Sequence, residues 1–291
     1  MTTPHASPLL RLALPKGHMF DAVVTLLADA GIRMQRGGRD YRPRLSLPDV
    51  EVKLLKPQNI VEMLHFGSRD AGFCGADWVA ELDARLEPVL DTGLDPIRLV
   101  AAAPEVLVAA GWPPRRPLVV ASEYERLTRG WITRQGLDAR FVRSFGATEV
   151  FPPEDADCIV DNTASGATLA ANQLAIVDEL MTSSTRLYTH PAALEDPVKR
   201  EVLERIALLL RSVLTARERV MVEVNVSAER LEAVCAALPC MREPTISPLH
   251  GASGYAVKAA VPRRDLPAVI PAVKAAGGSD IVVTALAQIV A

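Results

Sequence analysis

One segment of the chain combines an acid with a run of small and hydroxyl residues, CIVDNTASGATLAAN at 158–172. Small side chains let backbone N–H groups point into one volume, the start of a helix adds positive potential, and hydroxyls donate further hydrogen bonds, so such a loop can hold a phosphate. An acid just before the loop can accept hydrogen bonds from ribose hydroxyls. The pattern predicts a 5-phosphoribosyl site formed by Asp161, Ala164, Ser165, Gly166, Ala167 and Thr168.

The same pattern also fits an ordinary strand-to-helix turn with a capped helix. The segment has neither the GxxxxGK pattern of phosphate-binding loops nor the GxGxxG pattern of dinucleotide-binding folds, so kinases and dehydrogenases lose their usual sequence support. From the residues alone, the phosphoribosyl site and the plain turn both remain open.

The elements that position this loop begin with an apolar run at 9–14, followed by Met19, Val23, Leu26 and Leu27 at helical spacing. The next predicted elements are a hairpin-like pair of strands over 44–55, a helix over 58–65, a strand over 70–74 and a helix over 76–86. Strands and helices that alternate in this way are typical of an α/β fold with a parallel sheet.

A second lobe is predicted from the middle of the chain. Residues 92–108 are extended and apolar, and GWPPRRP at 111–117 can continue neither a helix nor a central strand. The alternation then resumes with strands at 118–121, 139–142 and 158–160 and a helix at 123–135, and residues 185–188 return the chain. We expect lobe I over about 1–103 and 184–217, lobe II over about 104–183, and a ligand cleft between them.

The last part of the chain predicts a separate small domain. A long helix over 196–217 has an apolar stripe and leads to a βαββαβ order over 218–291. Its predicted elements are strands at 220–226, 244–249, 255–261 and 281–284, with helices at 228–238 and 264–275. This order is that of the split ferredoxin-like unit, although a fold alone does not establish a function.

Composition excludes several classes of protein. The 291 residues are 49% hydrophobic and carry a net charge of −3, so no whole-molecule field would attract nucleic acid or anionic lipid. No apolar run is long enough for a membrane helix, and the opening residues lack a basic leader, so we expect a cytoplasmic protein. The four cysteines have no CxxC pair, which predicts reduced thiols and no protein-built metal site.

These motifs resemble those of the ATP phosphoribosyltransferase family, the first enzyme of histidine biosynthesis. The segment at 161–172 is similar to the family pattern DxVxTGxTLxxN, with Ser165 in place of the usual Thr and with polar Asn162 and Thr163 at apolar positions. LALPKGHM, LLKPQNI, DAGFCGADWV, ASEYERLT, MTSSTRLY and EPTISPL resemble further family segments in the correct order, over nearly the whole chain.

The resemblance implies a two-lobed catalytic region like that of periplasmic binding proteins, with a C-terminal ferredoxin-like regulatory domain. It implies that ATP and phosphoribosyl diphosphate give 1-(5-phosphoribosyl)-ATP and pyrophosphate. Mg²⁺ should arrive mainly with the diphosphate, because this ion keeps much of its water and favours phosphate oxygens. Histidine is the implied inhibitor, and a homo-oligomer, a hexamer, is the implied assembly.

The resemblance also implies roles for individual residues. Lys16 and Lys56 are expected at the polyphosphate, although either could be an ordinary surface lysine. Asp77 is expected at the ATP, and Tyr124 could stack on adenine or simply fill the core. His18 and Lys56 stand where the family usually has Arg, which leaves the role of position 18 open. Hydroxyls of the PTISPL segment, Thr245 and Ser247, are candidate histidine contacts or edge-strand donors.

Two other functions remain compatible with the sequence. A non-catalytic two-lobed protein could use the same cleft to bind a small molecule, but the phosphate loop and the missing leader argue against it. A catalytically weak relative could act as a regulatory partner, as the changes at His18, Lys56 and Asn162 would allow. Pyrophosphate release from ATP and phosphoribosyl diphosphate would separate these readings.

Overall fold

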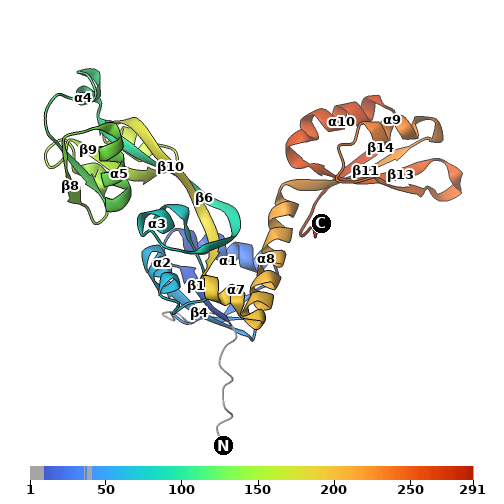
Figure 1. The fold of residues 1–291 in the computed structure, drawn as a ribbon. Helices are drawn as coiled ribbons and strands as arrows, with labels where there is room; N and C mark the ends of the chain where they lie inside the picture. The colour runs from blue at the N-terminus through green and yellow to red at the C-terminus, as the bar shows by residue number, and fades with distance from the viewer. Residues whose placement is uncertain (1–9, 36, 38–40, 291) are drawn as a thin grey trace, which may run out of the picture. The chain divides into compact units, whose positions relative to one another are not determined.

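The computed structural model describes residues 10–35, 37 and 41–290, and residue 9 of the first predicted strand lies outside them (Figure 1). Two compact units can be distinguished. The first comprises Met1–Ala28 and Ile32–Ala207, and the second comprises Asp29–Gly31 and Leu208–Ala291. Helix α8, Pro197–Arg217, contributes to both units. The expected boundary between 217 and 218 stays a prediction.

The first unit is built on one eight-stranded sheet in the order β4-β1-β5-β10-β6-β9-β7-β8. Its strands are β1 Leu10–Pro15, β4 Val50–Leu55, β5 Ala71–Gly75, β6 Glu87–Pro104, β7 Leu118–Ser122, β8 Ala139–Arg143, β9 Cys158–Thr163 and β10 Leu174–Thr189. β1, β4 and β5 run parallel, as do β7, β8 and β9. The long antiparallel strands β6 and β10 lie between these two groups and pair with each other, with β10 next to β5 and β6 next to β9. This arrangement confirms the predicted α/β fold with two lobes.

Helices flank the strands of each lobe. Those of the first unit are α1 Met19–Asp29, α2 Pro57–His65, α3 Ala76–Glu81, α4 Glu105–Ala109, α5 Glu125–Gln135, α6 Ala167–Ala171 and α7 Pro191–Glu195. Helix α1 buries the four side chains that its spacing predicts, Met19, Val23, Leu26 and Leu27. None of the helices within the described ranges is long and apolar enough to cross a membrane.

Several predicted elements are wrong in their pairing or length. The hairpin expected over 44–55 does not form: β3 (Arg44–Leu45) pairs with β2 (Met34–Gln35), whereas β4 joins β1 in parallel. β4 is the edge strand of the large sheet and buries alternate residues, since all six of its residues pair with β1 whereas β3 is only two residues long. Strand β6 begins at Glu87 and ends at Pro104, where α4 starts, so 105–108 is not extended.

The two faces of lobe II explain where the loop of 158–172 lies. Cys158 and Val160 of β9 pack in the cluster with Trp131 of α5, whereas Ile159 packs with Leu169 of α6. Side chains of a strand alternate between the faces. Asp161 therefore lies on the α6 face, and its neighbour Asn162 lies on the opposite face.

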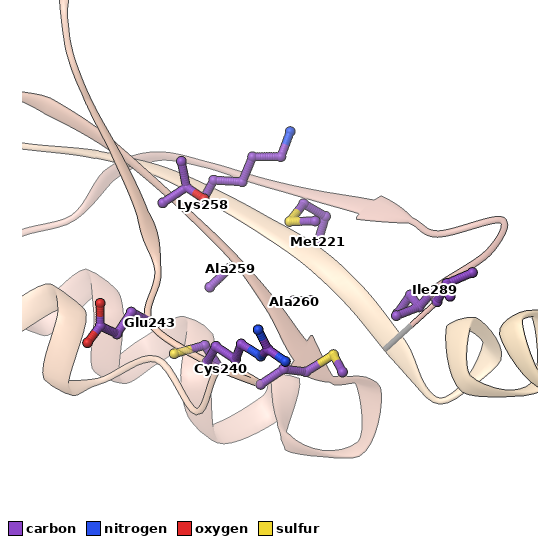
Figure 2. A pocket seen from close by; sticks show the side chains of 11 residues that line it. Met221, Cys240, Glu243, Lys258, Ala259, Ala260 and Ile289 are labelled. Carbon is purple, nitrogen blue, oxygen red and sulfur yellow. The ribbon is translucent and has the colours of Figure 1, made fainter.

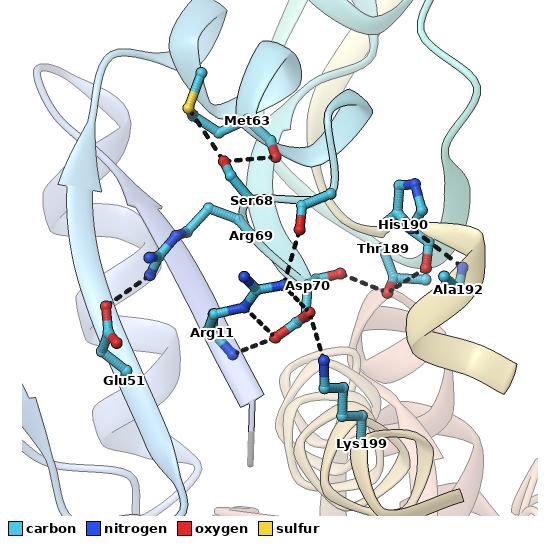
Figure 3. A network of polar contacts seen from close by, with 11 residues as sticks. Arg11, Glu51, Met63, Ser68, Arg69, Asp70, Thr189, His190, Ala192 and Lys199 are labelled. Carbon is cyan, nitrogen blue, oxygen red and sulfur yellow. Dashed lines mark hydrogen bonds and ion pairs between the residues drawn. The ribbon is translucent and has the colours of Figure 1, made fainter. Parts of the chain in front are cut away.

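A buried ion network forms at the amino ends of β1 and β5 (Figure 3). Asp70 is 4% exposed and accepts hydrogen bonds from the Arg11 guanidinium (2.7 and 3.0 Å) and from Lys199 Nζ of α8 (3.0 Å). Arg69 pairs with Glu51 of β4 at 2.9 Å. These contacts fasten α8 to the sheet of lobe I.

The second unit has a four-stranded antiparallel sheet in the order β12-β13-β11-β14. Its elements are β11 Arg219–Val226, α9 Leu231–Ala236, β12 Thr245–Pro248, β13 Tyr255–Pro262, α10 Leu266–Ala275 and β14 Ser279–Ala285. Strand β11 buries every second residue in a core that includes Val234 of α9 and Val273 of α10. The βαββαβ order and this strand arrangement confirm the ferredoxin-like unit.

Candidate active site

A cavity of about 510 Å³, the loop cavity, opens where β9 ends and α6 begins. Asp161 and Ala164, Ser165, Ala167 and Thr168 of the predicted phosphoribosyl site line it. Gly166 does not line the cavity but shapes its wall, because it takes a left-handed φ of +83° that a side chain would strain. The structure thus brings the six predicted residues together around one hollow.

Hydroxyl groups of the loop engage two of its own amides. The Gly166 N–H donates to Thr163 Oγ1 at 2.9 Å, and the Ala167 N–H donates to Ser165 Oγ at 3.3 Å. A phosphate entering this loop would compete with, or add to, these local hydrogen bonds. The sequence shows Thr163 as a hydroxyl residue of the loop, but the six predicted phosphoribosyl residues do not include it.

Asp161 lies in an unusually acidic setting. Burial is the largest cause that raises the pKa of the Asp161 carboxyl to about 6, although the Asn162 N–H donates to it at 2.7 Å. The neighbouring carboxylates of Glu149 and Glu123, which also line the loop cavity, contribute to this raised value. Among the described residues that line the cavity, only His18 has a basic side chain. Sequence reasoning missed both glutamates.

A second, smaller cavity of about 60 Å³, the junction cavity, lies between the lobes. It shares His18, Ile97 and Asn162 with the loop cavity. Its other lining residues include Asp77 and Trp78 of lobe I and Tyr124 of lobe II. His18, whose role the sequence left open, is thus the one titratable side chain of the described chain that lines both cavities.

Asp77 and Tyr124 meet directly across the lobes. Tyr124 donates from its hydroxyl to Asp77 Oδ2 at 2.7 Å, and Ser183 of β10 donates to Asp77 Oδ1 at 2.7 Å. Asp77 is 5% exposed and Tyr124 only 1%, with the Tyr124 ring stacked on Trp78 at 4.6 Å between centroids. In this arrangement the ring has no free face for a base, so stacking on adenine would require Tyr124 and Trp78 to separate.

The two predicted polyphosphate lysines lie apart from the cavities. Lys16 Nζ lies 4.6 Å from the centroid of the Tyr41 ring, a cation–π contact, and Lys56 is exposed at the N-cap of α2. Neither side chain lines the loop cavity or the junction cavity. Their role at a polyphosphate stays a prediction.

No group of three or more His, Cys, Asp or Glu residues within the described ranges could hold a metal ion. Asp161, Glu123 and Glu149 therefore do not form a metal cage of their own. The four cysteines are free thiols, and burial raises the pKa of Cys74 and Cys158 far above its usual range.

The C-terminal unit has its own cavity of about 450 Å³, the C-terminal cavity (Figure 2). Charged residues Arg242, Glu243 and Lys258 line it together with apolar side chains such as Met221 and Ile289. Thr245, a predicted effector contact, also lines it and lies opposite Lys258 in the sheet register. Ser247, the other predicted contact, pairs with Ala256 and does not line the cavity.

Comparisons with known proteins agree with this architecture. A family model described as ATP phosphoribosyltransferase matches residues 56–212, and one described as the C-terminal domain of the same family matches 216–288. The ATP phosphoribosyltransferases of Pelotomaculum thermopropionicum and Solibacter usitatus are 36% and 34% identical to this chain, each alignment covering 97% of the chain and 99% of the relative.

A solved structure is similar as well. A chain of the ATP phosphoribosyl transferase (HisG:HisZ) complex from Thermotoga maritima superposes with a TM-score of 0.61 at 26% identity. That match covers 69% of this chain and 98% of the Thermotoga chain. Together with the two family models and the full-length relatives, it shows that this chain belongs to the ATP phosphoribosyltransferase family.

Proposed function

We propose that the loop cavity binds phosphoribosyl diphosphate and that the chain transfers its 5-phosphoribosyl group to ring nitrogen 1 of the adenine of ATP, releasing pyrophosphate. The observation that carries this assignment is the meeting of Asp161 with the loop of 163–168 around one cavity. The loop would hold the 5-phosphate, and the ionised Asp161 would accept hydrogen bonds from the ribose hydroxyls.

The transfer reaction requires the two substrates to be held in position and does not require a strong base. Ring nitrogen 1 of adenine already carries a lone pair at neutral pH, so it can attack the anomeric carbon as the bond to the diphosphate breaks. Positive charge then develops on the ribose, and a carboxylate such as Asp161 stabilises it, while cationic groups stabilise the leaving pyrophosphate. We propose the ammonium groups of Lys16 and Lys56 as the cations for the pyrophosphate, and His18, which lines both cavities, as a hydrogen-bond donor to it.

Magnesium fits this scheme as part of the substrate. The lining of the loop cavity is rich in carboxylates, Asp161, Glu123 and Glu149, whereas phosphoribosyl diphosphate is a polyanion. Mg²⁺ bound to the diphosphate would neutralise much of that charge before the substrate meets these residues. We therefore propose that the magnesium complex, rather than the free diphosphate, is the form that enters.

The test is pyrophosphate release from ATP and phosphoribosyl diphosphate with Mg²⁺. The unaltered chain should release pyrophosphate only when both substrates are present, which a non-catalytic binding protein would not do. Asp161→Ala should reduce kcat/KM for phosphoribosyl diphosphate by about 100-fold or more, since a preorganised charge at the reacting centre is lost. Unchanged kcat/KM in Asp161→Ala would remove this residue from the mechanism.

We also propose that histidine inhibits the enzyme from the C-terminal cavity. The resemblance implies a histidine-binding regulatory domain, and this cavity offers Arg242 and Lys258 to a carboxylate and Glu243 to an ammonium group. Thr245→Val should raise the histidine concentration for half-inhibition about 3- to 10-fold, since the proposed hydrogen bond from the Thr245 hydroxyl to histidine is lost. Ser247→Ala is the matched control, because Ser247 does not line the cavity, and an equal effect of both substitutions would exclude this site.

The assembly is proposed from the resemblance alone, and the location from the pattern of apolar residues in the sequence. We propose a hexamer in the cytoplasm, and sedimentation of the purified chain tests the oligomeric state. A monomer that is fully active and fully inhibited by histidine would contradict the proposed hexamer.

A further inference from the structure

Helix α5 of lobe II receives its N-terminal cap from lobe I. Its own N-cap residue, Tyr124, forms no side-chain capping hydrogen bond. Instead Glu81, at the end of α3, accepts hydrogen bonds from the backbone N–H groups of Arg126 (2.9 Å, Oε1) and Leu127 (3.0 Å, Oε2). Both N–H groups belong to the first turn, where a helix has no partners of its own and where a negative charge is favoured.

Glu81 is buried, and a side chain of α5 in turn forms hydrogen bonds with the end of α3. Its residue is only 7% exposed, so its hydrogen bonds to α5 are protected from water. The Arg126 side chain reaches back to lobe I, donating to the Ala80 carbonyl at 2.7 Å and to Asp83 Oδ1 at 2.8 Å. The end of α3 and the start of α5 are therefore joined in both directions.

The capped turn begins at Tyr124, which links the two parts of the site. Tyr124 donates to Asp77 of lobe I at 2.7 Å and accepts from the Asn162 side-chain amide of lobe II at 3.1 Å. Asn162 follows Asp161 directly in β9. A shift of α5 relative to α3 would move Tyr124 and would break the chain of contacts between the predicted ATP residue Asp77 and the predicted phosphoribosyl residue Asp161.

We infer that Glu81 is a positioning residue for the transfer reaction: by capping α5 from lobe I, it holds Tyr124 between Asp77 and Asn162 and so sets the distance between the two substrate sites. It touches neither substrate in this scheme. The inference rests on the proposed transferase activity. It predicts that losing the cap impairs turnover while leaving the loop of lobe II able to bind phosphoribosyl diphosphate.

The experiment compares Glu81→Gln and Glu81→Ala with Glu125→Gln in the full chain. Glu125 is the matched control, because it lies in the same turn of α5 but pairs only within lobe II, with Arg129 and Arg143. We expect kcat to fall about 5- to 10-fold in Glu81→Gln, which keeps one acceptor oxygen, and about 30- to 100-fold in Glu81→Ala. The Kd of magnesium phosphoribosyl diphosphate, measured by calorimetry, should stay within about 2-fold of that of the unaltered chain.

A double-mutant cycle with Tyr124→Phe separates positioning from general support of the fold. If Glu81 acts through the Tyr124 hydroxyl, Glu81→Gln should cost much less activity in the Tyr124→Phe background than in the unaltered chain. Additive effects, or a loss of phosphoribosyl diphosphate binding equal to the loss of kcat, would overturn the inference, as would Glu81→Gln activity equal to that of the Glu125→Gln control. An unaltered chain that releases no pyrophosphate would instead refute the proposed function.

Discussion

Asp70 and Asp161 are two shielded carboxylates at opposite ends of the strands in their lobes, and their partners differ in kind. Asp70 precedes β5 and accepts hydrogen bonds from Arg11 and Lys199. Burial alone would raise the pKa of Asp70, but these cationic donors outweigh it and lower the pKa. Asp161 lies near the carboxyl end of β9 beside two glutamates, and burial with this repulsion raises its pKa to about 6.

The difference in partners suits Asp70 to a structural role and Asp161 to the ligand-binding role that we propose for it. At Asp70 the protein supplies the opposite charge itself, so the negative charge is already compensated and holds α8 to the sheet. At Asp161 the compensating groups must come from outside, which is the condition expected of a ligand site. In open α/β sheets ligands bind beyond the carboxyl ends of the strands, and Asp161 lies there, whereas Asp70 lies at the other end.

The largest expected effect is that of Asp161→Asn, which should lower activity and raise stability at once. The amide keeps the shape but cannot supply a negative charge to the developing ribose cation, so we expect kcat/KM to fall about 100- to 1000-fold. Removing an uncompensated charge should increase the free energy of unfolding at pH 8 by about 1–2 kcal/mol. Kinetics and urea unfolding of the same preparation check the fall in kcat/KM and the rise in unfolding free energy. A destabilised variant would show that Asp161 is a structural residue.

Asp70→Asn should show the opposite combination. It leaves Arg11 and Lys199 without their carboxylate, and since both cations are partly exposed we expect a loss of about 2–3 kcal/mol in unfolding free energy. Turnover below the unfolding temperature should stay within about 3-fold of the unaltered chain, because the network lies away from both cavities. A large fall in kcat with unchanged stability would show that Asp70 acts in the reaction rather than in the fold.

The two carboxylates should also respond oppositely to pH. Asp161 has a folded-state pKa above its unfolded value, so its contribution to stability is largest below about pH 4 and is lost as pH rises through about 6. Asp70 has a lowered pKa, so its contribution is present above about pH 4 and is lost as pH falls through the folded pKa.

Activity should follow the ionised form of Asp161. We expect kcat/KM for phosphoribosyl diphosphate to fall with a limiting slope of about tenfold per pH unit below pH 6, because the protonated carboxyl cannot supply the required charge. Asp161→Asn should remove this limb from the pH profile. A limb that persists in Asp161→Asn would assign the titration to another group.

The sequence predicts those features of the site that are local in the chain. The acid and the small residues of the loop lie within eight positions of one another, so their grouping around one cavity follows from a strand, a turn and a helix start. The four buried residues of α1 follow from helical spacing in the same way.

Features that depend on distant segments could not be predicted. Strand β4 pairs with β1, about forty residues earlier, and a single sequence carries no signal for that partner over the nearby β3. The stacking of Tyr124 on Trp78 and the Glu81 cap join lobes I and II over similar separations. For the same reason the sequence cannot place the Lys16 and Lys56 side chains relative to the cavities.

Asp77 is intermediate between Asp70 and Asp161, because it has partners within the protein but none of them is charged. Ser183→Ala tests this difference and has the smallest expected effect. The Asp77 carboxylate is buried like that of Asp70, but its donors are the neutral hydroxyls of Tyr124 and Ser183. Ser183 also accepts the Asp77 N–H at 3.1 Å, so the substitution removes two hydrogen bonds of one residue. We expect a loss of about 1 kcal/mol in unfolding free energy, less than for Asp70→Asn, because neutral donors contribute less than charged ones.

The functional consequence distinguishes the two possible roles of Asp77. If Asp77 binds ATP, freeing one of its oxygens should change the KM for ATP about 2- to 5-fold and leave that for phosphoribosyl diphosphate unchanged. Ser184→Ala is the matched control, since the neighbouring hydroxyl bonds to Asp91 instead. If both KM values stay constant while stability falls, Asp77 is a structural carboxylate like Asp70, with its partners within the protein, and its role is to join the lobes through Tyr124.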